Sequence, residues 1–351
     1  MSTATRVIPH LTCQLPSRTL LHVHGVESTK FLQGLITNDM NQLSNPNTAM
    51  FCHLLNQKGR AMFEAFVATP NSKSDLLSKD GGSYLMECHV DVAARLQRHL
   101  KMHKLRSKVK IANLEDSHEV WWSSQQCKSI NSQEDSTLCS FVDPRAPTLG
   151  TRTFVVKGSR ENVSKDDFSV IEEKYNMLRI LHGALEGKEV DGVIPLECNL
   201  DWLNGVVFDK GCYLGQELTA RTHYRGLLRK RCFPVILLEN EEGEQETINI
   251  TPKDIQDIVY GLSEKSYGVL FHDTGKKEVK EGATILNNGG KRAGKMMTNE
   301  TIGNAGIALM RLEHILGEEE GKRPKRLLTT NANDTTMVVR PMVVLKDNET
   351  L

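Results

Sequence analysis

The chain has 351 residues, of which 39% are hydrophobic and 25% are charged, and its 44 Lys and Arg balance its 44 Asp and Glu. This composition indicates a globular protein with one large core or two to three smaller ones, and it excludes fibrous and disordered classes. Zero formal charge provides no overall field that would draw the chain to nucleic acid or acidic lipid, so such a partner would need a local patch.

The first part of the chain predicts a strand followed by a helix. Residues 20–23 are an apolar run typical of a strand, and Gly25 supplies the turn after it. Ser28 is expected to be the N-cap of the helix, because a serine hydroxyl accepts a hydrogen bond from a free backbone N–H of the first turn. The helix is expected to end near residues 37–39 and to bury Phe31, Leu32, Leu35 and Ile36.

Two more strands and a second helix are predicted next. Residues 61–68 and 84–90 have the character of strands, and a polar connection containing Gly81 and Gly82 joins them. A basic helix is expected from about residue 92 to residue 104. Strands and helices that alternate in this way are typical of an α+β domain.

The segment 113–138 is rich in Ser and Gln and shows little periodicity. Trp121 and Trp122 provide its only cluster of large apolar side chains. This pattern predicts a surface insertion or the edge of a subdomain.

The clearest helix of the chain is expected after Ser164, its predicted N-cap, with Asp166 and Asp167 at its positive end. Gly183 and Gly187 mark where it stops. Its apolar residues at helical spacing are Phe168, Ile171, Tyr175, Leu178 and Leu185.

The last third of the chain has a different character. After Arg231, short β-rich runs alternate with loops rich in Gly, Asn and acidic residues, which predicts a separate β domain, most simply a barrel. These runs are residues 233–238, 267–271, 306–312 and 337–344. No apolar stretch reaches the roughly 20 residues of a spanning helix, so we expect no membrane span.

The eight cysteines are scattered without a CxxC pair, which favours a reducing compartment over a disulfide framework. The N-terminus contains Arg6 and Arg18, several Ser and Thr, and no acid before Glu27. This composition is compatible with the end of a mitochondrial transit peptide.

The most informative segment surrounds Cys212. Its central letters are Lys210-Gly211-Cys212-Tyr213-Leu214-Gly215-Gln216-Glu217. Glycines on both sides allow tight turns that place the thiol at the tip of a loop, and a nearby lysine favours the thiolate. Considered alone, the same letters also suit a buried cysteine at a strand turn.

This segment resembles the signature of the YgfZ family of the aminomethyltransferase fold, in the pattern KGCYxGQE after PLExNLDxLxGVxFx. Further matches are residues 31–39, Asp143-Pro144-Arg145 and residues 219–223. The resemblance implies an α+β fold, with an aminomethyltransferase-type folate-binding domain of two α+β subdomains at residues 1–228 and a C-terminal β-barrel at residues 229–351. It also implies the mitochondrial matrix and a late role in the maturation of [4Fe-4S] proteins.

Two positions depart from the catalytic members of this fold. Aminomethyltransferases carry an essential acid after a glycine turn, whereas the matching position here is Phe63, followed by Glu64. They hold the pterin with a glutamate where this chain has Leu181. A buried pterin needs hydrogen-bonding partners, so we do not expect a true aminomethyltransferase.

Folate remains an alternative on the sequence alone. Tetrahydrofolate would then bind in a central cavity near Asn38, Asp39, Glu64, Glu197 and Asn199, and would support one-carbon transfer or a redox role.

The first hypothesis is an iron-sulfur assembly factor in which Cys212 supplies a thiolate, a preferred ligand of iron in clusters. Clusters usually take four ligands, so Cys212 would share a [2Fe-2S] cluster with an A-type scaffold protein. Lys210 is expected to polarise the thiol, Glu217 and Arg221 to brace the loop, and Cys198 and Cys232 to pack in the core.

Other motifs carry less weight. Residues 289–295 match GxxxxGK, but Met296 stands where a P-loop has Ser or Thr, so a hairpin turn is expected. His99 and His103 lack a third metal ligand at fixed spacing. The segment 221–231 has no acid and suits either a polyanionic tail, an acidic partner or an exposed strand and linker. A nucleic-acid role is the third alternative, disfavoured by the neutral charge.

Overall fold

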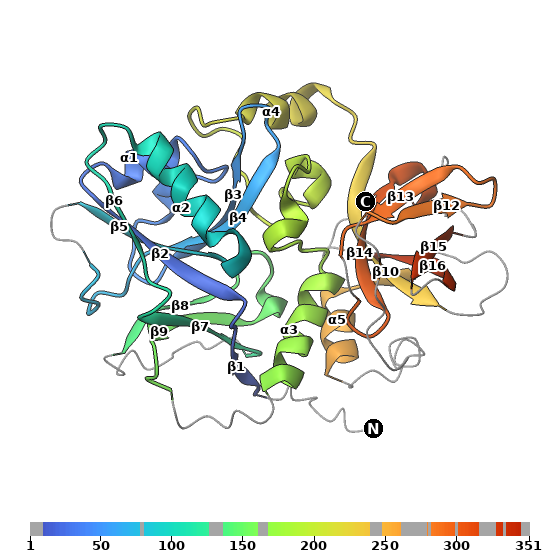
Figure 1. Ribbon diagram of the computed structural model, residues 1–351, viewed down its shortest axis with the longest axis horizontal. Coiled ribbons are helices and arrows are strands. Elements are labelled where there is room, and N and C mark those ends of the chain that lie inside the picture. The colour runs from blue at the N-terminus through green and yellow to red at the C-terminus, as the bar shows by residue number, and fades with distance from the viewer. Residues whose placement is uncertain are drawn as a thin grey trace, which may run out of the picture.

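The computed structural model describes residues 10–77, 81–125, 136–160, 168–238, 248–260, 279, 282–298, 301–315, 328–332 and 335–344. In these ranges the strands form sheets of five, four and seven strands (Figure 1). The first two sheets and the helices around them make up the larger part of the molecule, and the seven-stranded sheet forms a distinct body beside them.

The five-stranded sheet is antiparallel throughout and supports two helices. Its strands, in spatial order, are β3 (Ala49–Leu55), β4 (Ala61–Ala68), β5 (Gly82–His89), β2 (Arg18–Gly25) and β6 (Lys110–Asn113). The helices α1 (Ser28–Gln33) and α2 (Val90–Lys104) pack their apolar side chains on one face of it. Leu96 and Leu100 of α2 are fully buried there, as the helical spacing of apolar residues requires.

The predicted strands and helices of this region exist, with shifted boundaries. The helix α1 ends at Gln33, because Gly34 follows as its C-cap, and not near residues 37–39. Its N-cap is Glu27. Ser28 is the first helical residue, and its hydroxyl donates to the carbonyls of Gly25 and Gly82, so it fixes the turn instead of capping the helix.

The segment 113–138 was expected to be a surface insertion or the edge of a subdomain, and for its strand at residues 118–123 the surface insertion is wrong, because this strand lies inside a sheet and is largely buried. The second sheet has the order β1 (Thr12–Gln14), β7 (His118–Ser123), β9 (Thr151–Val156) and β8 (Thr137–Val142). Trp121 and Trp122 lie on β7, and the Trp122 indole is fully buried and donates to the Leu149 carbonyl at 2.6 Å. Buried aromatic residues stabilise this sheet although the sequence around them is polar.

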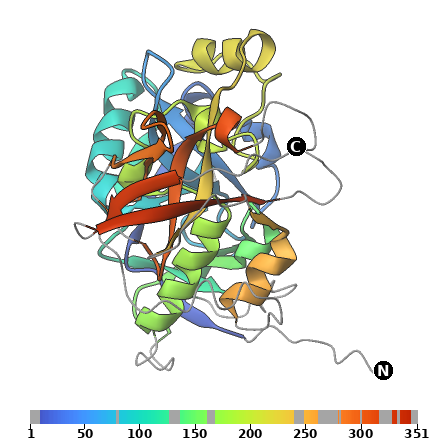
Figure 2. The ribbon, with the colours of Figure 1, turned by 90° about the vertical axis from the view of Figure 1, so that its right-hand side faces the viewer.

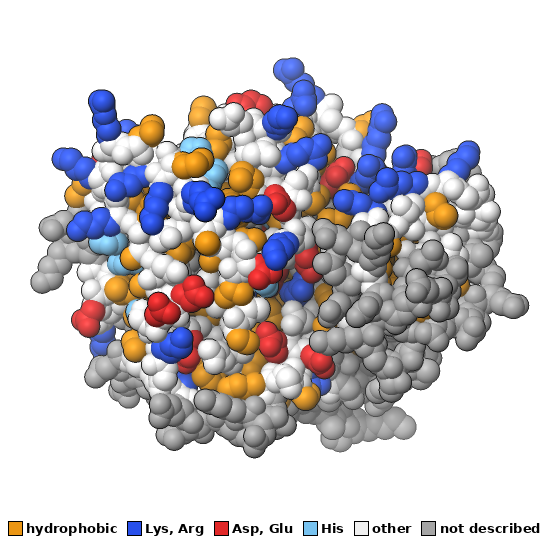
Figure 3. All heavy atoms as spheres, in the orientation of Figure 1, with side chains coloured by type: hydrophobic (Ala, Val, Ile, Leu, Met, Phe, Trp, Pro, Cys, Tyr) orange, Lys and Arg blue, Asp and Glu red, His pale blue; other side chains and the backbone are white. Residues whose placement is uncertain are grey.

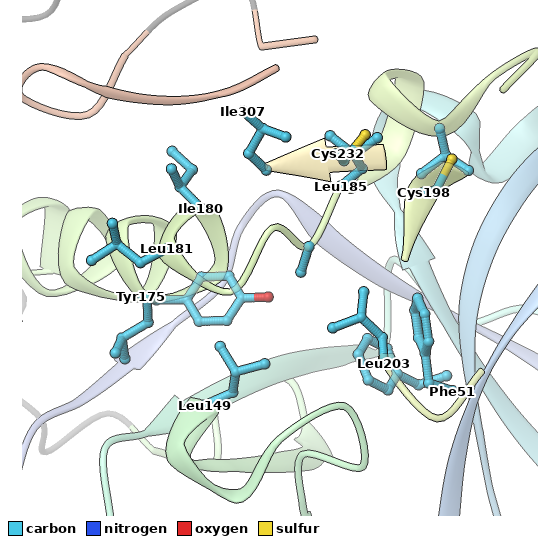
Figure 4. Packing of buried hydrophobic residues seen from close by; sticks show 14 of the residues in the cluster. Phe51, Leu149, Tyr175, Ile180, Leu181, Leu185, Cys198, Leu203, Cys232 and Ile307 are labelled. Atoms are coloured by element: carbon cyan, nitrogen blue, oxygen red, sulfur yellow. The ribbon is translucent and has the colours of Figure 1, made fainter. Parts of the chain in front are cut away.

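The helix α3 (Phe168–Leu181) connects the two parts of the molecule. Its packing partners include α5 (Pro252–Val259) and β14 (Ala305–Arg311), and Figure 2 shows α3 and α5 beside the barrel strands. Its Tyr175, Leu178 and Leu181 are buried in a core cluster that also contains Leu149 and Ile307 of other elements (Figure 4). The predicted cap Ser164, with Asp166 and Asp167, lies outside the described residues.

The remaining strands close into a barrel, as predicted. Its order is β10 (Lys230–Leu238), β14 (Ala305–Arg311), β13 (Arg292–Met296), β12 (Thr284–Asn287), β15 (Leu328–Ala332) and β16 (Thr335–Val344), and β16 pairs back to β10. The short β11 (Ile248–Ile250) joins β16 in parallel. The expected run 267–271 lies outside the described residues.

The other helical elements are short. They are α4 (Gln216–Arg225) and the 3₁₀ turns η1 (Met40–Gln42), η2 (Pro147–Leu149), η3 (Gly187–Val190), η4 (Pro195–Cys198) and η5 (Leu312–His314). Over the part of the chain that the structure describes, none of the helices is both long and apolar enough to span a membrane.

Candidate functional site

Cys212 lies on an exposed loop that precedes α4, the helix at the top of Figure 1. The other described cysteines are all buried: Cys13, Cys52, Cys88, Cys139, Cys198 and Cys232. Cys127 lies outside the described residues. Among the cysteines that the structure describes, Cys212 alone is exposed to solvent, which is the loop-tip alternative that the flanking glycines allowed, and Cys198 and Cys232 pack in the core as expected.

Lys210 fastens the start of this loop to the end of α1. Its ammonium donates to the carbonyls of Gln33 at 2.8 Å, Ile36 at 2.8 Å and Asn38 at 2.7 Å. An ammonium has three N–H donors, so these bonds use all of them and leave none for the Cys212 thiolate. The expected polarisation by Lys210 is thus replaced by a positioning role. Burial lowers the pKa of Lys210 to about 8, so it stays largely protonated at neutral pH.

Tyr213 and Gln216 shape the turn between the cysteine and α4. The Tyr213 ring lies under the Lys210 ammonium, with 4.9 Å from nitrogen to ring centre. The Tyr213 amide donates to Oε1 of Gln216 at 3.2 Å, so the first helical residue holds the turn that precedes it. Burial raises the pKa of Tyr213 to about 12, which keeps its phenol neutral. These contacts give the loop a defined shape around an otherwise free thiol.

Gly215 sets the end of the loop against the turn that joins β3 and β4. It has φ +78°, and a Cβ there would stand 2.9 Å from the Leu55 side chain and 3.1 Å from the Cα of Gly59. The amide of Leu214 also donates to the Gly34 carbonyl at 3.0 Å. At Gly211, in contrast, an added Cβ would have no neighbouring atom within 4 Å. Of the two glycines, only Gly215 is required by its surroundings.

The predicted bracing by Glu217 and Arg221 is not what the structure shows. Both side chains are exposed on α4, and neither pairs with a charged group of the described residues. The segment 221–231 also differs from the expected strand and linker, because α4 continues to Arg225 before the linker begins at Gly226. The outer side of α4 and this linker is therefore a free basic surface.

Two apolar side chains stand out on that same surface. Tyr224 is 65% exposed and Leu227 is 85% exposed. Beside them, the rings of Phe208 and His223 stack with their centres 3.6 Å apart, which fixes α4 on the segment that leads into the cysteine loop. Cys212 thus lies next to a face of mixed apolar and basic character.

A buried network of charges fills the middle of the larger part, and the sequence alone did not predict it. Arg18 donates to Glu64 at 2.7 and 3.1 Å and to Glu87 at 2.7 Å. Arg145 donates to Asp143 and to Glu186, and Arg152 bridges Glu87, Asp143 and the Tyr175 hydroxyl. The signal in the sequence was a glutamate at position 64 and another at 87, each inside an apolar strand, where an unpaired charge would be costly.

The arginines of this network lower the pKa of two of its carboxylates, Glu186 and Asp143. Burial alone would raise the pKa of Glu186, but the guanidinium groups of Arg18 and Arg145 hold it well below its usual range. Asp143 behaves in the same way, because Arg145 and Arg152 lower its pKa against the effect of burial. Glu87 is the exception, because burial raises its pKa although Arg152 and Arg18 act against this, and its Oε2 has no partner among the described groups.

The expected folate residues are mostly used by the protein itself. Glu64 is fully buried, and its two oxygens accept from Arg18, with the Gly187 amide adding a third bond. The Asn38 amide donates to the carbonyls of Phe51 and Asn204. Its oxygen accepts from Asp39 and Gln42.

The last three expected folate residues lie in different settings. Asp39 caps η1, and the amide of Asn41 lowers its pKa. Asn199 donates to the carbonyls of Gly183 and Cys232, while its Oδ1 is buried with no partner among the described groups. Glu197 lies half-buried on η4, where burial raises its pKa. Asp39 keeps its Oδ2, because Gln33 and Asn41 both donate to Oδ1, so these three residues retain acceptor atoms.

The two departures from the catalytic pattern lie in the core. Phe63 is fully buried in the apolar cluster beneath α2, on the opposite face of β4 from Glu64. Leu181 is also fully buried, at the end of α3. Side chains that fill a core cannot also contact a substrate.

The remaining motifs resolve as structural features. The Gly-rich residues 289–295 cover the end of the turn between the antiparallel β12 and β13 and the start of β13, with Gly290 at φ +69°, as predicted for a hairpin. His99 and His103 lie with their ring centres 4.3 Å apart. Within the described ranges, no group of three or more His, Cys, Asp or Glu is arranged to hold a metal ion.

Comparisons with known proteins agree on the family. Residues 229–341 match the family model described as CAF17, C-terminal beta-barrel domain. The chain is 33% identical over 329 residues to the mitochondrial iron-sulfur cluster assembly factor IBA57 homolog of Aspergillus clavatus, a match that covers 86% of this chain and 70% of the relative. The homolog of the same name from Aspergillus fumigatus is 34% identical over 331 residues, with the same coverage of both chains.

A relative from another organism and a solved structure extend the comparison. The IBA57 homolog of Dictyostelium discoideum is 35% identical over 252 residues, covering 64% of this chain and 62% of the relative. The crystal structure of the glycine cleavage system aminomethyltransferase T from Bartonella henselae matches with a TM-score of 0.63 and 11% identity, over 95% of this chain and 85% of that one. At that identity the likeness establishes the aminomethyltransferase fold.

Proposed function

The chain belongs to the family of mitochondrial iron-sulfur cluster assembly factors, and from this premise we propose that it acts late in the maturation of mitochondrial [4Fe-4S] proteins, through the thiolate of Cys212. The observation that carries this proposal is the exposed position of Cys212 on a loop whose other contacts are all internal. The loop holds the sulfur outward, so that a second protein can reach it.

A single cysteine leaves most of a cluster's coordination to another molecule. Such clusters usually take four protein ligands, and soft thiolate sulfur is the preferred kind. Cys212 therefore supplies one ligand to a [2Fe-2S] cluster that an A-type scaffold protein holds with the rest. The cluster is cargo in this scheme, and the bridged complex is transient because one bond tethers it to this chain.

The surface beside Cys212 supports the docking of such a partner. Arg221, Arg225 and Arg229 are exposed there without a described counter-ion, next to the exposed Tyr224 and Leu227. Interfaces favour aromatic and Arg residues at their centres. A partner with an acidic rim and an apolar centre fits this face, and its approach would bring a bound cluster to the Cys212 sulfur.

Folate is the alternative cofactor, and most of the residues that were expected to bind it are not placed to do so. Glu64 and Asn38 already make internal hydrogen bonds. The position at which the aminomethyltransferases have a glutamate for the pterin is here the buried Leu181. The acceptors left are Oδ2 of Asp39 before η1, and the half-buried Glu197 and the buried Oδ1 of Asn199 at η4, which replace neither Glu64 nor the missing glutamate at position 181. We therefore propose no step that depends on folate.

The experiment that tests the proposal is an anaerobic titration with a [2Fe-2S]-loaded A-type scaffold, followed by visible absorption and complex size. Wild type is expected to form a coloured heterocomplex, and Cys212→Ser to form none, because a serine hydroxyl is a poor ligand for cluster iron. Gly211→Ala is the matched control. It changes the neighbouring residue, where a methyl group meets open space, and is expected to behave as wild type.

Two further results separate ligation from docking. If Cys212→Ser binds the unloaded scaffold as well as wild type does, the cysteine acts on the cluster and the α4 face provides the contact. A coloured complex that forms equally well with Cys212→Ser would show that Cys212 is not a ligand, and the proposal would fail.

A further inference from the structure

The C-terminal end of α2 and the loop after it form a second surface, which we call the α2 tip. It comprises residues 101–110 together with Val26 of the adjoining turn. The letters of this segment are Lys-Met-His-Lys-Leu-Arg-Ser-Lys-Val-Lys, with no acid among them. Figure 3 shows Lys and Arg side chains gathered with hydrophobic ones over the region of α1 and α2, at the upper left of the view.

The basic side chains of the α2 tip are free. Lys101, Arg106, Lys108 and Lys110 are exposed and Lys104 is half-buried, and none of them pairs with a carboxylate of the described residues. The neighbouring acid Glu27 is engaged by the backbone, because its Oε2 accepts from the Lys108 amide at 2.6 Å. A dense positive charge is thus left facing solvent on a chain of zero formal charge.

Three large apolar side chains stand among these cations. Leu105 is 86% exposed, Met102 is 62% exposed and Val26 is 58% exposed. Val26 lies beside the loop, because the neighbouring Gly25 sits against the backbone of Lys108 and Val109. Single exposed apolar side chains are common on protein surfaces, but a group of them rimmed by charged residues marks an interaction surface.

The backbone at Leu105 adds an independent observation. It follows α2 with φ +47° and ψ −114°, a conformation that glycine adopts freely and that is strained for a leucine. A glycine would fit this helix end better. The strained backbone keeps the bulky Leu105 side chain exposed to water within the basic loop. Backbone strain of this kind is typical of functional sites.

We propose that the α2 tip binds the surface of an anionic lipid bilayer, independently of the function proposed for Cys212. Lysines around the tip face the acidic headgroups, while Leu105, Met102 and Val26 enter the boundary between headgroups and acyl chains. The patch is dominated by lysine. It has no Phe, Tyr or Trp on which single-stranded bases would stack, and Arg106 is its one guanidinium among four lysines, which favours lipid over nucleic acid.

The test is co-sedimentation of the full chain with vesicles of phosphatidylcholine that contain about 30 mol% phosphatidylglycerol, with pure phosphatidylcholine as the comparison. Binding is expected only to the anionic vesicles and is expected to fall steeply at about 500 mM salt, where the charges are screened. Replacing Lys101, Lys104 and Lys108 with Gln is expected to weaken partition about a hundredfold, since each lysine contributes about fivefold. The control replaces three exposed lysines elsewhere, Lys58, Lys253 and Lys291, with Gln.

Leu105→Gly separates the apolar contribution from folding. It relieves the backbone strain, so its melting temperature is expected to equal or exceed that of wild type, while vesicle partition falls about tenfold. Leu227→Ser is its control, because Leu227 is equally exposed, at 85%, on the α4 surface. Equal partition of Leu105→Gly and wild type would overturn the proposal. So would tighter binding to a 20-nucleotide RNA duplex than to the vesicles, which would assign the patch to nucleic acid.

Discussion

Gly215 and Gly59 lie against each other at the point where the cysteine loop meets the turn between β3 and β4. A Cβ on Gly59 would stand 2.8 Å from the Gly215 carbonyl oxygen, and one on Gly215 would stand 3.1 Å from the Gly59 Cα. Both have positive φ, +76° and +78°. The position of Cys212 therefore depends on a backbone contact between two segments more than 150 residues apart in sequence.

Gly215→Ala is expected to lower the free energy of unfolding by about 2 kcal/mol or more, because a side chain there is strained and collides with the β3–β4 turn. The displaced loop should also lose its complex with a cluster-loaded scaffold, even though Cys212 is intact. Urea unfolding and the anaerobic titration measure the two effects.

Gly211→Ala is the control for this substitution. No atom lies within 4 Å of the new methyl group and φ there is not positive, so the change in stability is expected to stay within about 0.5 kcal/mol. Equal losses from the two substitutions would mean that the loop is not held by the contact with Gly59.

Arg18→Met is expected to destabilise the protein by about 3 to 5 kcal/mol, since it leaves the carboxylate of Glu64 buried without its guanidinium partner and removes one of the two that Glu87 has. Arg95→Met is the matched control, because Arg95 also pairs with a carboxylate, that of Asp191, but both side chains are more than 40% exposed. An exposed pair is expected to contribute about 1 kcal/mol or less. Chemical denaturation measures the free energy of unfolding of both variants. Similar decreases for Arg18→Met and Arg95→Met would contradict this account.

The stability of the protein is expected to fall below pH 6.5 because of its buried histidines. Burial lowers the pKa of His22, His53, His99 and His182 to about 4. Between pH 6.5 and 4 the unfolded chain therefore binds more protons than the folded one, so the full stability is present above pH 6.5 and is lost as the pH falls. The slope is up to about 1.4 kcal/mol per pH unit for each histidine, measured by urea unfolding across this range.

His182→Gln isolates one of these contributions. His182 bonds to the Thr148 hydroxyl at 2.9 Å, a contact that glutamine can keep while losing the titration. The slope of stability against pH is expected to decrease by about one proton. An unchanged slope would show that His182 does not titrate on unfolding.

The sequence predicted the features that local rules govern. Short β-rich runs between Gly-rich and acidic loops identified the barrel strands β10, β14 and β16, and the flanking glycines allowed the exposed position of Cys212 as one of two alternatives. It also predicted the family, because the letters around Cys212 form an unusual combination. These features need no knowledge of what lies far away in the chain.

What the sequence did not predict depends on distant partners. Lys210 looked like an activator of its neighbour Cys212, but its three acceptors come from residues 33–38, more than 170 positions earlier. Glu64 looked like a ligand for a cofactor, whereas its partner is Arg18 on another strand. A charged residue in an apolar strand indicates a buried pair, but local sequence does not say with what.

The last prediction concerns Asn199, which ties the larger part to the barrel. Its amide donates to the carbonyl of Gly183, after α3, and to that of Cys232 on β10, each at 3.0 Å, and its own φ is +62°. Asn199→Ala is expected to lower stability by about 3 kcal/mol, because it leaves two carbonyls unpaired and adds backbone strain. Asn199→Gly removes only the hydrogen bonds and is expected to be about 1 kcal/mol less harmful.

Unfolding followed through Trp202, which lies 3.7 Å from the Arg231 guanidinium of β10, reports on this junction. Wild-type stability of Asn199→Gly would mean that other contacts, such as the Asp201 to Arg231 ion pair, hold the two parts together without it.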